Sequence, residues 1–138
     1  MKNEYLRHTL ATINYRFEKS VNESKEDFGE FRLGKGSRTS KEIINHMYHV
    51  LNSTRIYLIE ERINFEQPEQ LTLSQEIERF KYELTNTDKA LDITELPINY
   101  SKRLIQGPLS DILTHIGQIS MMQRLNGKPI NAEDFSSA

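Results

Sequence analysis

The stretch LSQEIERFKYELTNTDKAL, residues 73–91, carries the clearest structural signal in this chain of 138 residues. Five apolar residues and one threonine follow one another at intervals of four, three, four, three and four: Leu73, Ile77, Phe80, Leu84, Thr87 and Leu91. This spacing places a single stripe along one face of an α-helix, which is typical of helices that pack at a shallow angle in a bundle. The stretch therefore predicts one helix of a helical bundle.

Two stretches on the N-terminal side have the same period. Residues 6–17 repeat apolar side chains at three- and four-residue intervals and predict a first helix. A second helix is expected from about residue 39 to residue 62, because Thr39 and Glu42 match a capping box and a broad apolar face follows them. The chain has two valines against fourteen leucines, a composition that also favours helices over strands.

The fourth helix is expected to begin at Gly107-Pro108, because a proline at the first helical position loses no hydrogen bond. Gly127 is suited to end it. Residues 21–38 and 93–106 are then left as loops that are long for a bundle, and such loops often cover a site. We therefore predict one all-α domain over the whole chain, 1–138, folded as an up-down-up-down four-helix bundle.

The composition excludes several classes of protein. Eighteen basic and twenty acidic side chains leave a net charge of −2, which argues against a nucleic-acid partner bound through its phosphates. The absence of cysteine excludes disulfides, thiolate metal sites and a cysteine nucleophile. No apolar run approaches the roughly 18 residues of a membrane span, and no signal peptide is recognisable, so no membrane partner and a cytoplasmic location are expected.

Three side chains of ligand type are expected to meet between the second and fourth helices. His115 follows Asp111 by four residues, which places both on one face of the fourth helix. In an up-down-up-down bundle the second and fourth helices run parallel. His46, seven residues after Thr39, and His115, seven residues after Pro108, would then lie about 10 Å from the same end. The sequence thus predicts a divalent metal site with open coordination positions.

Each of these residues also has an ordinary structural explanation. His46 follows the spacing of the core residues around it, and a histidine on an apolar face is commonly a satisfied core residue. Asp111 lies in a first helical turn, where a carboxylate complements the helix dipole. His49 is expected at the rim, since it lies about 60° around the helix from His46, and His8 on a solvated face.

Two further residues of the fourth helix suggest contacts. Gln118, one turn beyond His115, is a candidate substrate-binding residue that could orient a ligand by hydrogen bonding, or simply a polar residue at the helix edge. Gly117 costs about 1 kcal/mol relative to alanine within a helix. Its presence suggests that a neighbouring helix or a ligand passes close to it, and close helix packing is the expected reason.

Three stretches of the chain form a further motif: residues 38–47 (RTSKEIINHM), 106–119 (QGPLSDILTHIGQI) and 122–130 (MQRLNGKPI). The first resembles the second helix of the DinB/YfiT-like proteins, and the other two resemble the last helix of that family. In order, spacing and length the resemblance covers almost the whole chain. It implies a four-helix bundle that holds one divalent metal ion through a histidine of the second helix and an H-x-x-x-H pair of the last.

Carried onto this sequence, the resemblance matches His46 to the first ligand and His115 to the last. Asp111 stands where a histidine is commoner, and this leaves both the identity of the metal and its occupancy open. One aspartate with two histidines suits iron, manganese, nickel or zinc, and the oxygen ligand slightly favours the first two.

The resemblance implies a function only broadly, because characterised relatives include transferases and isomerases that use small cytosolic thiols. We expect a divalent-metal-binding enzyme of thiol-transferase or hydrolase type that acts on a small molecule, with a low-molecular-weight thiol as a candidate substrate. The alternative is a non-catalytic module for small-ligand binding or interaction, with a degenerate metal site.

A homodimer is expected from aromatic residues that lie off or beyond the clean stripes: Tyr5, Tyr15, Phe28, Phe31 and Phe65. A narrow bundle buries one stripe per helix, so some of these rings must be exposed, cover the site or meet a partner chain. The first helix and residues 21–38 are the expected contributors. Scattered surface aromatics are the ordinary alternative.

Overall fold

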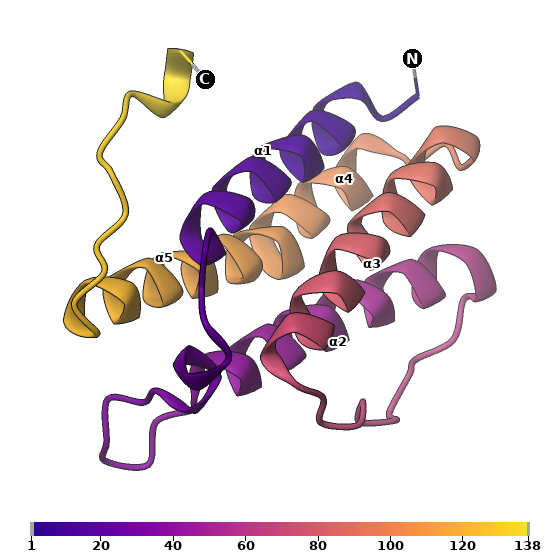
Figure 1. Ribbon diagram of the computed structural model, residues 1–138. Coiled ribbons are helices and arrows are strands. Elements are labelled where there is room, and N and C mark those ends of the chain that lie inside the picture. The colour runs from indigo at the N-terminus through magenta and orange to yellow at the C-terminus, as the bar shows by residue number, and fades with distance from the viewer. Residues whose placement is uncertain (1, 138) are drawn as a thin grey trace.

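The computed structural model describes residues 2–137, and within this range the chain is helical and contains no strand. Four long helices form the bundle (Figure 1): α1 (Glu4–Val21), α2 (Ser40–Glu60), α3 (Leu73–Ile93) and α5 (Ser110–Leu125). Four short elements complete it: the 3₁₀ helices η1 (Glu26–Glu30) and η3 (Phe135–Ser137), the helix α4 (Ile98–Leu104) and the π-helical turn η2 (Ile105–Leu109). The predicted all-α four-helix bundle is confirmed at this level.

Local sequence signals explain where the helices begin and end. At the start of α2, the Glu42 N–H donates to the Thr39 hydroxyl and the Thr39 N–H donates to the Glu42 carboxylate, which confirms the capping box. At the end of α5, Gly127 has a left-handed φ of 87°, and the Lys128 N–H donates to the Gln123 carbonyl at 2.8 Å. This is a Schellman motif, so the predicted stop at Gly127 is confirmed.

The prediction that the last helix begins at Gly107-Pro108 is wrong, as is the prediction of a loop at 93–106. The helix begins at Ile98, and Pro108 lies inside it, in the π turn η2. Proline has no N–H to complete a regular α turn. A π turn bonds carbonyls to residues five positions on, and the Ser110 N–H and hydroxyl accordingly donate to the Ile105 carbonyl. Helix α4 buries one side chain, that of Leu104, so it has no apolar stripe to detect.

The predicted up-down-up-down order is also wrong, because α2 and α3 run parallel. The Asn45 amide donates to Glu76, and the Asn52 amide donates to Glu83, so both pairs are separated by 31 positions. A constant separation of this kind belongs to parallel neighbours. Residues 61–72 return along the pair: twelve extended residues span about 40 Å, more than the roughly 31 Å length of α2.

Helix α5 runs antiparallel to α2, because the beginning of the last helical stretch lies beside the end of α2 (Figure 1). Helix α1 is antiparallel to α3, because Arg7 near the start of α1 binds Asp88 near the end of α3. Helix α1 runs beside α5 in the same direction (Figure 1). Near the end of α2, Tyr57 stacks on Tyr100 of α4 with 6.3 Å between ring centroids. Because α4 and η2 extend the last helix on its N-terminal side, α5 itself lies beside the first half of α2, where His46 is.

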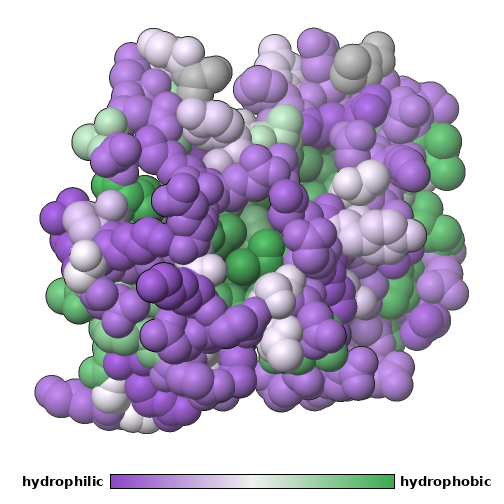
Figure 2. All heavy atoms as spheres, in the orientation of Figure 1, coloured by the Kyte–Doolittle hydropathy of each residue, from purple (hydrophilic) through white to green (hydrophobic). Residues whose placement is uncertain are grey.

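The core lies between the four long helices, and within it Phe17 and Phe80 meet edge to face with 4.7 Å between ring centroids. Each long helix contributes to it, and η1 adds Phe28, which is 2% exposed. On the face drawn in Figure 2 most of the surface is hydrophilic, with hydrophobic residues visible near its middle. No helix within residues 2–137 is both long and apolar enough to cross a lipid bilayer.

Candidate metal centre

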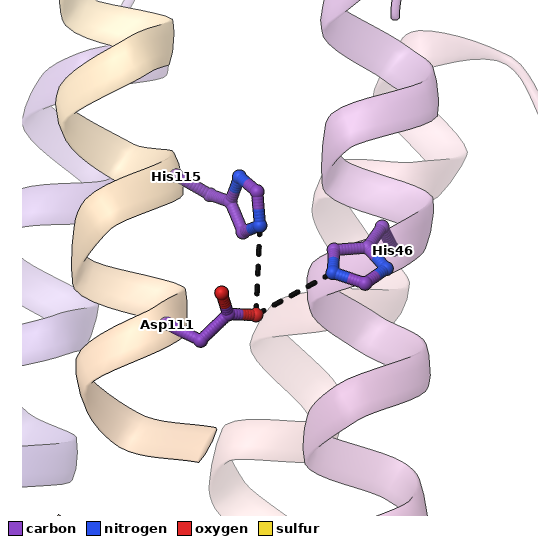
Figure 3. Close-up of side chains that lie close together, drawn as sticks. All are labelled: His46, Asp111 and His115. Carbon is purple, nitrogen blue, oxygen red and sulfur yellow. Dashed lines mark ion pairs between the residues drawn. The ribbon is translucent and has the colours of Figure 1, made fainter. Parts of the chain in front are cut away.

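The structure brings together the three predicted ligands, His46 of α2 and Asp111 and His115 of α5 (Figure 3). The Asp111 Oδ2 atom lies 3.4 Å from His46 Nε2 and 3.5 Å from His115 Nε2. The two imidazole rings are nearly perpendicular, with 4.9 Å between their centroids. Two helices thus present one carboxylate and two imidazoles to a common point.

The two distances from Asp111 to the histidines fit a shared metal ion. Ligand atoms bound to one ion at about 2.1 Å lie roughly 3.0–3.5 Å apart in tetrahedral or octahedral geometry. Both distances from Asp111 to the histidines are of this size, and one ligand atom from each of the three residues lies within 4.8 Å of the other two. The group could therefore hold a metal ion.

These contacts are too long to be good hydrogen bonds, which have donor–acceptor distances of about 2.7–3.2 Å. Asp111 Oδ2 and the Nε2 atoms of His46 and His115 are therefore not held by strong hydrogen bonds to one another and could bind a ligand between them. The Asp111 side chain is 46% exposed, His46 is 30% exposed and His115 is 12% exposed. Solvent reaches the group mainly on the Asp111 side, where open coordination positions would lie.

The surroundings of His46 favour its neutral form. Burial lowers the pKa of the His46 imidazole below its usual range, neighbouring Arg38 and His115 lower it further, and Asp111 opposes them. A neutral imidazole is the form that binds metal. The effect of Arg38 on His46 could not be read from a sequence motif. Arg38 lies directly before the N-cap Thr39 and therefore at the same end of α2 as His46.

Gln118 lies against His115 in the structure. The two residues share one face of α5, and Gln118 Oε1 is 2.8 Å from His115 Nδ1. The opposite ring nitrogen, Nε2, is the atom that faces Asp111. The amide oxygen of the expected substrate-binding residue is therefore engaged by an expected metal ligand.

The other singled-out residues lie away from this group. His49 lines a polar hollow beside Glu69 and Arg79 and does not belong to the metal-ligand group. His8 is exposed, as predicted. The expected close approach at Gly117 is wrong: a Cβ built there meets no described atom within 4 Å outside its own helix.

A second polar cluster, which the sequence did not reveal, lies on the opposite flank of α2. Glu76 and Glu83 of α3 are buried, with relative exposures of 0% and 1%. Glu83 accepts hydrogen bonds from Asn52 and from Arg55, whose Nε lies 2.7 Å from the carboxylate. The only sequence signal for this cluster is a common spacing: Asn45 and Asn52 are seven residues apart, and so are Glu76 and Glu83.

Compared with models of protein families, with curated proteins and with solved structures, the chain has no match. Its class is therefore defined by the fold and the site: an all-α four-helix bundle with a His–Asp–His group between α2 and α5 that could hold a metal ion.

Proposed function

We propose that this protein is a DinB-like, divalent-metal-binding bundle with His46, Asp111 and His115 as the protein ligands. The observation that carries the proposal is the convergence of one oxygen and two nitrogen atoms, with both oxygen–nitrogen distances suited to a shared ion. Three ligands from the protein leave positions for water or a substrate, as catalytic metal sites require. The ligand set suits iron, manganese, nickel or zinc.

We further propose that the site serves a metal-dependent enzyme of thiol-transferase or hydrolase type that acts on a small molecule. A divalent ion held there would lower the pKa of a bound thiol or water and polarise a carbonyl group. The resemblance to DinB/YfiT-like proteins supports a low-molecular-weight thiol as the substrate. The exposed side of Asp111 supports access for a ligand of that size.

The second candidate is a non-catalytic module for small-ligand binding or interaction, with a degenerate metal site. It is favoured by one observation: Asp111, at the position where relatives commonly have histidine, is the most exposed of the three ligands. The two candidates agree on the location of the site and differ in whether an ion stays bound.

Metal analysis of protein purified without a histidine tag separates the two candidates. Offered iron, manganese, nickel and zinc in turn, the enzyme candidate binds close to one equivalent of at least one metal. A chain that retains none of the four after removal of loosely bound ions would overturn the metal proposal and leave the non-catalytic module.

A cytoplasmic location, no nucleic-acid or membrane partner and a homodimer complete the proposal. For the dimer, Tyr5 and Phe65 support an association surface because each is 83% exposed. Phe28 does not contribute, since it is buried in the core. Tyr15 instead contacts the C-terminal segment through Phe135. Sedimentation equilibrium at micromolar protein tests the dimer, and a single 16.2 kDa species across the concentration range would contradict it.

A further inference from the structure

Which nitrogen of the neutral His115 ring carries the hydrogen decides whether this residue can bind a metal ion. The present inference rests on the proposed metal site. A neutral imidazole carries one N–H and one lone pair on its two nitrogens. The nitrogen that faces Asp111 and His46 is Nε2, so a metal ion in the group requires the lone pair there and the hydrogen on Nδ1. In a histidine side chain surrounded by water, nothing restricts the hydrogen to Nδ1, and it can also lie on Nε2.

Two contacts compete for that hydrogen. Gln118 Oε1 lies 2.8 Å from Nδ1, a full hydrogen-bond distance, whereas Asp111 Oδ2 lies 3.5 Å from Nε2. An amide oxygen only accepts hydrogen bonds, so the shorter contact requires an Nδ1–H donor. The stronger interaction thus selects the tautomer that frees Nε2.

The helix supplies this contact without help from any other element. Gln118 follows His115 by three residues, a spacing at which side chains on one helix face meet. The side chain of Gln118 is exposed, so its amide has no part in the core. A contact that contributes little to packing but orients a ligand ring is typical of the outer partners of metal-bound histidines.

We propose that Gln118 is a positioning residue: it accepts the Nδ1–H of His115 and so presents the Nε2 lone pair to a divalent metal ion. The contact lies within α5, so it should also form in the metal-free protein. This role replaces direct binding of substrate as the function of Gln118.

Nitrogen NMR of the full-length, metal-free protein tests the tautomer directly, at a pH well above the usual imidazole pKa of about 6.5. The wild type should show His115 with hydrogen on Nδ1. Gln118→Ala should shift it toward the Nε2–H form, and Gln118→Glu should restore the Nδ1–H form because its carboxylate also accepts. Thr114→Ala is the matched control, since its hydroxyl bonds only to the backbone of the same helix, and it should change nothing.

Metal titration of the same proteins supplies the second readout. Gln118→Ala should bind metal about 10–100-fold more weakly, the usual effect of losing an outer partner of a metal-bound histidine, and Gln118→Glu should stay within a few-fold of the wild type. An Nε2–H tautomer in the wild type, or an unchanged tautomer in Gln118→Ala, would overturn the positioning role whether or not metal binds. A tautomer that shifts as expected in a protein that binds no metal would support this role for Gln118 and overturn the proposed function instead.

Discussion

The two flanks of α2 carry carboxylates in opposite situations. On the α3 side, the Glu83 side chain is 2% exposed and receives hydrogen bonds from Asn52 and Arg55, the latter with an Nε–oxygen distance of 2.7 Å. On the α5 side, the Asp111 side chain is 46% exposed and faces two imidazoles at 3.4 and 3.5 Å. Each site pairs an acid with one basic side chain from α2, Arg55 in the first and His46 in the second, yet only the first is closed.

The difference teaches how a structural polar cluster is distinguished from a binding site. A buried carboxylate is tolerated only when its oxygens are hydrogen-bonded and its charge is paired, which is the condition of Glu83. Asp111 keeps contact with water, and the atoms around it face a common point without bonding to one another. The closed cluster holds α2 against α3, and the open group is left to bind a ligand.

The largest expected effect comes from opening the closed cluster. Glu83→Ala removes the acceptor of Asn52 and leaves Arg55 without its partner, which should lower the free energy of unfolding by about 3 kcal/mol. Asp111→Ala in metal-free protein should change it by no more than about 0.5 kcal/mol, because that side chain is half-exposed. Urea unfolding followed by circular dichroism measures both. Similar losses in the two variants would contradict the comparison.

The next effect concerns the ligands of the open group. His46→Ala, Asp111→Ala and His115→Ala should each weaken metal binding at least about 100-fold, since losing even an outer partner costs 10–100-fold. His49→Ala is the matched control on α2 and should bind as the wild type does. Equilibrium dialysis with metal analysis gives the affinities. Unchanged binding in the His46 and His115 variants would show that the metal lies elsewhere.

Acid should weaken metal binding at the open group, because protons compete with the metal for the histidines. Burial, Arg38 and His115 hold the pKa of His46 below its usual value near 6.5. Because the pKa of His46 is lowered, the affinity should stay level from about pH 8 to below 6.5 and fall only at still lower pH. Calorimetric titrations across this range measure it. An affinity that does not change down to pH 5 would speak against histidine ligands.

The smallest expected effect separates helix stability from the site. Gly117→Ala should raise the free energy of unfolding by about 1 kcal/mol, because alanine is the better helix former and the added methyl group meets open space. Metal affinity should stay unchanged, since Gly117 belongs to neither polar group. Thermal unfolding and metal titration of the same variant test this. A loss of stability would mean that another group occupies the space beside this glycine.

Local patterns predicted much of the fold. The stripe from Leu73 to Leu91 and the capping box at Thr39 identify helices α3 and α2 because helix formation depends on residues three or four positions apart. Helix α4 escaped prediction because its one buried side chain makes no stripe. The π turn was not predicted because a proline such as Pro108 is equally suited to begin a helix.

The candidate site was predicted in part for a reason that does not hold. His115 and Asp111 share a helix face by their spacing, which any α-helix guarantees. The meeting with His46 was expected from parallel helices, whereas α2 and α5 run antiparallel. It occurs because α4 and η2 extend the last helix and place α5 beside the first half of α2. The three-residue spacing of His115 and Gln118 permits their contact, but the sequence did not predict it, since the side-chain rotamers decide it.

By itself, then, the sequence determined the helical class, the extents of α2 and α3, the stop at Gly127 and the shared face of Asp111 and His115. All of these depend on backbone geometry and neighbours within one or two turns. Only the tertiary structure decided the direction of α3, the burial of Glu76 and Glu83 and the approach of His46 to α5. These depend on which surfaces remain to be covered once the helices meet, and residues far apart in the chain determine that together.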